Sequence, residues 1–417
     1  MTLNRMSWND RKIFRLLIIP CTVFIFLLMA AAHPSQAQNK MQAQNKRLLA
    51  YYGRSLDSKP GQVAYNAGNI PYDELTHIIH VSLGLDPRGD GTLYVRPGLL
   101  EPELISRAHA AGVKVMITVG AATARFATVS ANADARAALA KNLHDFVVAN
   151  GYDGVDIDWE YPDGLEQRSN CTLMMLAIRK ALPAPYLLSM ATTGNPTLPG
   201  SSSYDSYDIE ALSQILDFFN VMTYDFHGPW TSHSGHNSPL FQSPKDPGTD
   251  DGSLAASIDI YLNYFHVPAE KLNIGSGFYG YEFTTAKGLW QPCDKCQTTT
   301  FYRGYGAYIK PRINAMGWKR KFDPAAQAPY LIRSSPAEPG FITYDDAEST
   351  ARKVDYVLGK RNLGGFFIWA IGGADSDYDG HSEDLLTAMS EAFKKYGTLP
   401  AKQENPPVAP EPAALQK

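Results

Sequence analysis

The segment DGVDIDWE, residues 153–160, carries carboxylates at alternate positions among apolar residues. Strands normally exclude Asp and Glu, and a buried carboxylate without compensation is costly in free energy. Because residues two apart in a strand share one face, Asp156, Asp158 and Glu160 are expected to line up on one side. This pattern favours a site that moves protons, with Glu160 as the terminal acid.

Two other interpretations of the acidic segment compete with a catalytic one. The spacing of Asp156, Asp158 and Glu160 resembles the start of a calcium-binding loop, but the intervening residues are strand-like and Tyr161 stands where such a loop needs glycine. A charged strand at an exposed edge is the second alternative, and it would leave the flanking apolar residues facing the interior. Both fit the pattern less well than an acid–base site.

The acidic segment also resembles the DxxDxDxE signature of the family-18 glycoside hydrolases, the chitinases and their relatives. Three further segments resemble motifs of that family. MTYD at 222–225 resembles the motif on its sixth barrel strand, GFYG at 277–280 resembles the motif on its seventh, and FFIW at 366–369 resembles its eighth strand with a terminal tryptophan. Order and spacing fit along roughly residues 47–396. Taken alone, Tyr224 and Asp225 would be interpreted as structural residues, and the spacing of the motif around them favours a functional role.

The resemblance implies a retaining, substrate-assisted mechanism in which the N-acetyl carbonyl of the sugar attacks the anomeric carbon. Glu160 would act first as acid and then as base, Asp158 would orient the acetamido group, and Tyr224 would hydrogen-bond its oxygen. The residue pattern alone would instead make Asp158 the nucleophile. The expected catalytic residues are Glu160, Asp158, Asp156, Tyr224 and Asp225, and the expected substrate-binding residues are Trp369, Tyr52, Met222, Tyr161, Trp230 and Tyr279, with Trp290 as a further candidate.

Short apolar runs alternate with helix-period stretches along the chain, which indicates an α/β fold with a parallel sheet. The predicted strands are 48–52, 78–83, 113–119, 154–158, 186–191, 218–224, 272–277 and 365–370, and the clearest predicted helices are 103–111 and 135–150, each followed by glycine. Periodicity does not separate a closed barrel from a doubly wound sheet. The family resemblance favours a TIM (β/α)8 barrel with a small α+β insertion between strands seven and eight.

The predicted organisation places a signal peptide at 1–37, because basic residues precede an apolar run and a small-x-small cleavage site. An uncleaved membrane anchor is the alternative. A linker at 38–46, a barrel at 47–280 and 341–396, an insertion domain at 281–340 and a disordered tail at 397–417 complete the prediction. The protein is therefore expected to be secreted, extracellular or periplasmic, with no membrane contact after signal cleavage.

The net charge of −4 offers no basic surface for nucleic acid. No cofactor is expected, and the protein is expected to be a monomer. No metal is expected either, because the spacing of His227, His233 and His236 matches no common zinc pattern. Cys293 and Cys296 are expected to form a local disulfide in an oxidising compartment, and Cys171 is expected to be a buried thiol.

Some positions depart from the family pattern: TVGA at 118–121 stands where Ser-x-Gly-Gly is usual, Ser82 replaces an aromatic residue, and Tyr281 replaces a frequent arginine. These changes leave the acid intact and the shape of the sugar subsites open. The resemblance implies chitin or chito-oligosaccharides as partners and a chitinase as the leading hypothesis. The alternatives are a chitin-binding lectin and an endo-β-N-acetylglucosaminidase or peptidoglycan glycosidase on the same fold.

Overall fold

Eight parallel strands form a closed barrel in the computed structural model, which describes residues 46–54, 64–195, 205–248, 252–293, 295–333, 335, 337–372 and 377–401. The barrel strands are β1 (Arg47–Tyr52), β2 (His77–Leu85), β4 (Lys114–Gly120), β5 (Gly154–Asp158), β6 (Leu187–Thr193), β7 (Phe218–Met222), β8 (Leu272–Gly277) and β14 (Gly365–Ile371). Their order is β1-β14-β8-β7-β6-β5-β4-β2, and pairing of β1 with β2 closes the ring. The predicted TIM barrel is confirmed.

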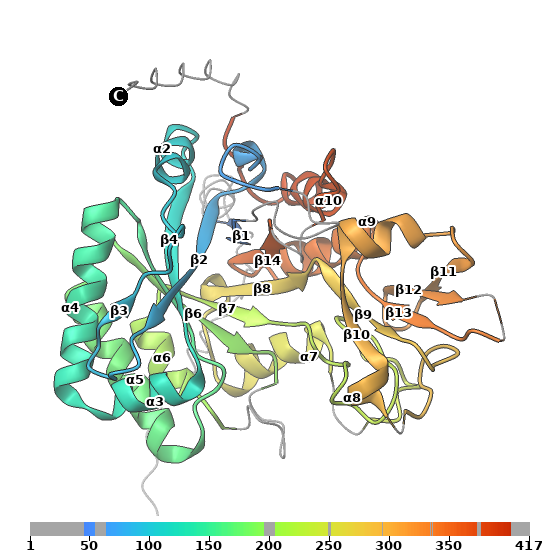
Figure 1. The fold of residues 1–417 in the computed structure, drawn as a ribbon, viewed down its shortest axis with the longest axis horizontal. Coiled ribbons are helices and arrows are strands. Elements are labelled where there is room, and N and C mark those ends of the chain that lie inside the picture. The colour runs from blue at the N-terminus through green and yellow to red at the C-terminus, as the bar shows by residue number, and fades with distance from the viewer. Residues whose placement is uncertain are drawn as a thin grey trace, which may run out of the picture.

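Helices surround the barrel and connect its strands (Figure 1). They are α2 (Pro102–Ala110), α3 (Thr123–Ala131), α4 (Ala133–Asn150), α5 (Gly164–Ala181), α6 (Ile209–Ile215), α7 (Leu254–Asp259), α9 (Ala347–Val354) and α10 (Asp384–Phe393). Short 3-10 turns occur at Tyr72–Glu74, Ala269–Lys271 and Lys310–Arg312, and π-helical turns at Ile260–Tyr264, Tyr305–Ile309 and Asp355–Lys360. A two-stranded ribbon joins β3 (Leu93–Tyr94) to the end of β2.

Local sequence explains how the best-defined outer helix begins and ends. The side chain of Asn132 accepts hydrogen bonds from the backbone N–H groups of Asp134 and Ala135, which caps the start of α4. Gly151 ends the helix with φ 73°, a left-handed conformation that costs glycine little. The chain then enters β5 three residues later, so the length of α4 fixes where the acidic strand begins.

A second sheet lies beside the barrel, inserted between β8 and β14 (Figure 1). Its antiparallel order is β10-β9-β13-β12-β11, with β9 (Tyr279–Phe283), β10 (Thr300–Gly304), β11 (Trp318–Asp323), β12 (Ala328–Arg333) and β13 (Phe341–Thr343). The short helix α8 (Cys296–Thr299) lies within it, next to the disulfide between Cys293 and Cys296. This is the α+β insertion that was expected, and the predicted local disulfide is present.

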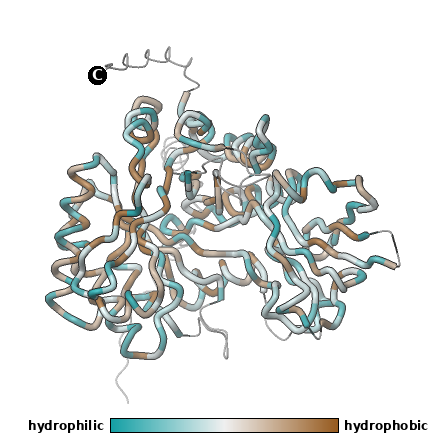
Figure 2. The backbone as a smooth tube through the Cα atoms, viewed as in Figure 1, coloured by the Kyte–Doolittle hydropathy of each residue, from teal (hydrophilic) through white to brown (hydrophobic). Residues whose placement is uncertain are grey.

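Barrel strands are buried on both faces, so two apolar layers surround each one. Figure 2 shows apolar residues running through the central strands. In β1, Leu48, Ala50 and Tyr52 belong to the outer layer between strands and helices, whereas Leu49 and Tyr51 belong to the layer inside the barrel. The two-residue alternation of a strand therefore assigns each side chain of β1 to one layer.

The predicted signal peptide lies outside the described residues, as does most of the predicted linker and tail. Within the described part of the chain, no helix combines the length and the apolar character needed to cross a membrane. Cys171 is a free, buried thiol on α5, as predicted.

Candidate active site

A cavity of about 830 Å³ opens at the carboxyl ends of the barrel strands, where barrel enzymes hold their active sites. Its walls come from five barrel strands or the loops that follow them, and from the inserted sheet. The lining residues include Tyr51, Asp158, Glu160, Tyr161, Met222, Tyr224, Asp225, Trp230, Tyr279, Tyr302 and Trp369, together with His227, His233 and Asp246.

Asp156 lies beneath the cavity floor and is completely buried. Its carboxylate accepts hydrogen bonds from four side chains on four other strands: Tyr51 (3.0 Å), Thr118 (3.0 Å), Ser189 (2.5 Å) and Asn220 (3.2 Å). Burial raises the pKa of Asp156 to about 6, and the four donors oppose that rise. Asp156 is therefore ionised near neutral pH and has a fixed position.

Asp158 lies between Asp156 and the cavity, and its carboxyl group is hydrogen-bonded to that of Glu160. Burial raises the pKa of Asp158 well above its ordinary value, and the charges of Glu160 and Asp156 raise it further. One Asp158 oxygen is buried and has no hydrogen-bond partner in the part of the chain that the structure describes. The three carboxyl groups together disfavour full ionisation, so Asp158 and Glu160 share a proton.

Glu160 follows β5 by two residues and reaches the cavity with an exposed side chain. Partial burial is the largest cause that raises the pKa of Glu160, with the charge of Asp225 acting in the same direction. The hydroxyl of Tyr161 is hydrogen-bonded to Glu160 and opposes that shift. Loss of solvent around the carboxyl group therefore raises the pKa of Glu160 more than the neighbouring carboxylate does.

Tyr224 and Asp225 follow β7 rather than ending it, because that strand stops at Met222. Asp225 adopts the left-handed conformation, with φ 63°, and its backbone N–H donates to the side chain of Asn237 (2.9 Å). Its carboxylate accepts hydrogen bonds from Tyr279 (2.6 Å) and Tyr281 (2.9 Å). These contacts hold Asp225 at the cavity wall, where its charge acts on Glu160.

Aromatic rings form much of the cavity wall. The ring of Trp369 lies tilted against that of Tyr51, with centroids 5.5 Å apart. Tyr302 of the inserted sheet stacks on Tyr279 at 4.5 Å, and Trp230 packs edge-on to Tyr281 at 5.5 Å. Trp230 is 54% exposed, so it presents apolar surface at the cavity mouth. Such rings suit the apolar faces of pyranose sugars.

The structure corrects the expectation for Tyr52. Its side chain is fully buried in the outer layer, and its hydroxyl donates to Glu101 (2.7 Å), so it cannot contact a ligand in the cavity. Tyr51, one residue earlier, faces the cavity and Asp156 instead. The remaining predicted substrate-binding residues, Trp369, Met222, Tyr161, Trp230 and Tyr279, all line the cavity. Trp290 does not line it and packs against the ring of His227.

Sequence reasoning missed Tyr51, Tyr302 and Asp246 as cavity residues, and also three of the donors to Asp156. The two-residue alternation of β1 would have predicted that Tyr51 lines the cavity if the face of β1 that points into the barrel had been known. Nothing in the local sequence marks Tyr302 or Asp246, because each belongs to a loop or sheet whose position depends on the fold. Two histidines, His227 and His233, approach Asp246 on the cavity wall and are the only described residues grouped closely enough to hold a metal ion.

A parallel α/β barrel with proton-sharing carboxyl groups and aromatic walls at its carboxyl end defines a hydrolase of sugar polymers. The model of glycosyl hydrolases family 18 matches residues 47–375, so the chain belongs to that family and is a glycoside hydrolase.

Known relatives are chitinases from several phyla. Chitinase A1 of Niallia circulans is 31% identical over 72% of this chain and 45% of its own length, so the chain spans just under half of that protein. Probable chitinase 2 of Drosophila melanogaster is 28% identical over 89% of the chain and 80% of its own length. A solved structure of Ostrinia furnacalis Group IV chitinase in complex with allosamidin has TM-score 0.73 and 22% identity, covering 85% of this chain and all of that one.

Proposed function

We propose that the protein is a chitinase that hydrolyses β-1,4 bonds between N-acetylglucosamine residues. The observation that carries the proposal is the carboxyl pair of Asp158 and Glu160, which share a proton at the floor of an aromatic-walled cavity. A general acid needs a proton near neutral pH, and the raised pKa of both groups supplies one. The chitinase names of the relatives support the same substrate.

Each carboxyl group takes a separate role in this mechanism. Glu160, which is exposed in the cavity, protonates the leaving glycosidic oxygen and later accepts a proton from the attacking water. Asp158 gives up the shared proton to Glu160 and, once ionised, orients and stabilises the acetamido group. Asp156 stays charged beneath them and favours proton placement on the other two.

The attacking group is the N-acetyl carbonyl of the substrate rather than a protein carboxylate, which makes the reaction retaining. Asp158 is half-buried and hydrogen-bonded to Glu160, so it is assigned the acetamido nitrogen rather than the anomeric carbon. Tyr224, which follows β7 and also lines the cavity, is assigned the acetamido oxygen. Trp369 is assigned the apolar face of the reacting sugar.

Replacing Glu160 with Gln tests the role of the acid. Turnover of chito-oligosaccharides is expected to fall by at least ~10²-fold, the usual contribution of a general acid, while binding of the oligosaccharide is retained. Glu166→Gln is the matched control, because Glu166 is an exposed glutamate in the first turn of α5. Equal turnover in the two variants would remove Glu160 from the mechanism.

A lectin and a glycosidase that acts on N-glycan cores or peptidoglycan are the alternatives. A lectin would bind chito-oligosaccharides without releasing products, and the presence of Glu160 argues against it. Mass spectrometry of products from chitin, glycoprotein and peptidoglycan separates all three functions.

The proposed function also includes export to an extracellular or periplasmic space, which the N-terminal segment supports. N-terminal sequencing of the exported protein would test cleavage after Ala37.

A further inference from the structure

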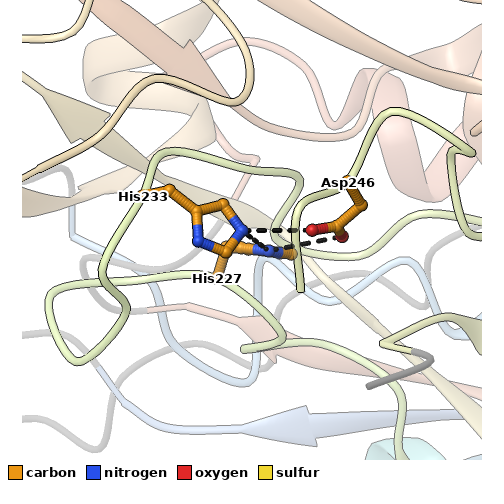
Figure 3. A group of neighbouring side chains, drawn as sticks. All are labelled: His227, His233 and Asp246. Atoms are coloured by element: carbon orange, nitrogen blue, oxygen red, sulfur yellow. Dashed lines mark hydrogen bonds and ion pairs between the residues drawn. The ribbon is translucent and has the colours of Figure 1, made fainter. Parts of the chain in front are cut away.

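Three side chains on the cavity wall point toward one another: His227, His233 and Asp246 (Figure 3). The Nε2 atoms of the two histidines are 3.1 Å apart. His233 Nε2 lies 3.1 Å from one oxygen of Asp246, and His227 Nε2 lies 3.5 Å from the other. All three residues belong to the loop between β7 and α7, but up to 19 positions of sequence separate them, so the loop must fold back to bring them together.

When both histidines are neutral, the cluster has fewer N–H protons than the acceptor atoms that face one another in it. His227 Nδ1 lies 3.0 Å from the backbone carbonyl of His236 and donates to it, so in the neutral ring Nε2 carries a lone pair. A neutral His233 brings one proton on Nε2, which has both His227 Nε2 and Asp246 as acceptors. The His227 lone pair also faces an Asp246 oxygen. Neighbouring lone pairs of this kind repel one another unless a metal ion or an additional proton lies between them.

The burial of Asp246 and His227 also indicates that the negative charge of Asp246 needs a positive partner. The side chain of Asp246 is 4% exposed and that of His227 is 7% exposed. Buried carboxylates are stabilised by a cation or by coordination to a metal. In the described part of the chain, the ion-pair partners of Asp246 are these two imidazoles, without lysine or arginine. The backbone N–H of Gly248 donates to one Asp246 oxygen at 2.9 Å and fixes its direction.

We propose that His227, His233 and Asp246 bind a divalent transition-metal ion, with Zn²⁺ as the best match. Zinc takes imidazole nitrogen and carboxylate oxygen at about 2.0–2.1 Å in tetrahedral geometry, which places ligand atoms about 3.3 Å apart. The two Nε2 atoms are 3.1 Å apart and His233 Nε2 is 3.1 Å from one Asp246 oxygen, both close to that value, while the other Asp246 oxygen lies 3.5 Å from His227 Nε2. The hydrogen bond from His227 to the His236 carbonyl is the kind of outer contact that orients a metal-binding imidazole.

His236 is not part of the proposed site, although it lies near both histidines in sequence. Its Nε2 pairs with Asp323 of the inserted sheet at 3.4 Å. Asp246 supplies the third ligand, which explains why histidine spacing alone gave no zinc pattern. All three ligands line the cavity, so water or a polar group of a sugar could supply the fourth ligand. The site is independent of the proposed hydrolysis.

Zinc titration of the full chain tests the site directly. The protein is treated with chelator, dialysed and titrated with ZnCl₂ by isothermal titration calorimetry, and Co²⁺ is used in parallel for its visible absorption. One ion per chain is expected, with the intense absorption bands of low-symmetry, four- or five-coordinate cobalt. His233→Ala and Asp246→Asn are each expected to weaken zinc binding by at least ~10-fold, because loss of even an outer contact costs that much.

His144→Ala is the matched control, because His144 forms an ordinary exposed pair with Asp145 at 3.2 Å and has no third ligand. Its zinc affinity is expected to equal that of the unaltered chain. Asp246→Asn nearly preserves side-chain shape, and the thermal midpoint of each metal-free variant verifies folding. If the unaltered chain fails to bind zinc, or if both ligand variants bind as tightly as the control, the proposal is overturned and the cluster is a protonated histidine–carboxylate pair.

Discussion

The carboxyl groups of Asp158 and Glu160 are hydrogen-bonded to each other, the first half-buried and the second exposed in the cavity. A single residue, Trp159, separates them, so both point to the same side. Asp156, two residues earlier, is held by four donors and lies beneath the pair. A proton can therefore pass between Asp158 and Glu160 without a change in the backbone.

Replacing Asp225 with Asn is expected to shift the alkaline limit of activity to lower pH. The negative charge of Asp225 raises the pKa of Glu160, so its removal lowers that pKa, and the proton needed for catalysis is lost at lower pH. The measurement is kcat/KM against pH on a chito-oligosaccharide. Asp163→Asn, at an exposed position near the start of α5, is the control and should leave the limit in place. An unchanged or higher limit for Asp225→Asn would contradict the expected coupling.

Asp156 is expected to make folding stability depend on pH. Its pKa is about 6 in the folded protein against 3.8 ordinarily, so the folded state keeps its proton longer than the unfolded state as pH rises. The resulting stabilisation is complete below pH 3.8 and is lost as pH rises through 6. Relative to Asp156→Asn, the free energy of unfolding should fall by roughly 3 kcal/mol across this interval, from the two-unit shift.

Urea unfolding of both proteins at several pH values between about 2.8 and 7 provides this comparison, because the range extends one unit beyond each of the two pKa values. Only the change with pH matters, because the constant difference also includes the hydrogen bonds that Asn alters. A difference between the two proteins that stays constant with pH would show that Asp156 titrates alike in both states.

Tyr51 and Tyr52 are neighbours with opposite expected effects. Tyr51→Phe removes a donor to the charged Asp156, and such bonds contribute about 1.5–3 kcal/mol, so turnover should fall by at least ~10-fold. Tyr52→Phe removes the hydrogen bond to Glu101 in the outer layer, so stability should fall by about 1–3 kcal/mol while turnover stays unchanged. Steady-state kinetics and urea unfolding of both variants would reveal any reversal of the two effects.

Deacetylated substrate tests the proposed attacking group. If the N-acetyl carbonyl is the nucleophile, a chain whose sugars all carry free amines cannot form the intermediate, whatever the protein supplies. Reducing ends are expected to appear from acetylated oligosaccharides and to be absent from fully deacetylated ones of the same length. Efficient cleavage of the deacetylated chain would instead favour Asp158 as a nucleophile, with the two carboxylates acting in the ordinary retaining mechanism.

The sequence by itself determined the elements and the acidic row. The alternation of carboxylates in β5 predicted that Asp156, Asp158 and Glu160 share a side, because strand periodicity is a local property. The helix ends at Gly112 and Gly151 were likewise readable, since both glycines have the left-handed conformation that follows a helix. The choice of a barrel needed the family motifs, because alternating strands and helices also describe an open sheet.

Only the tertiary structure decided which face of β1 meets the cavity. All six residues of that strand except Arg47 are apolar or aromatic and buried. Its sequence therefore shows no polar–apolar alternation that would assign Tyr51 and Tyr52 to different faces. Closure of the barrel also decided the surroundings of Asp156, whose donors lie 33 to 105 positions away in sequence. The meeting of His227 and His233 with Asp246 has the same cause: contacts between distant residues depend on the folded path of the chain, which local periodicity does not record.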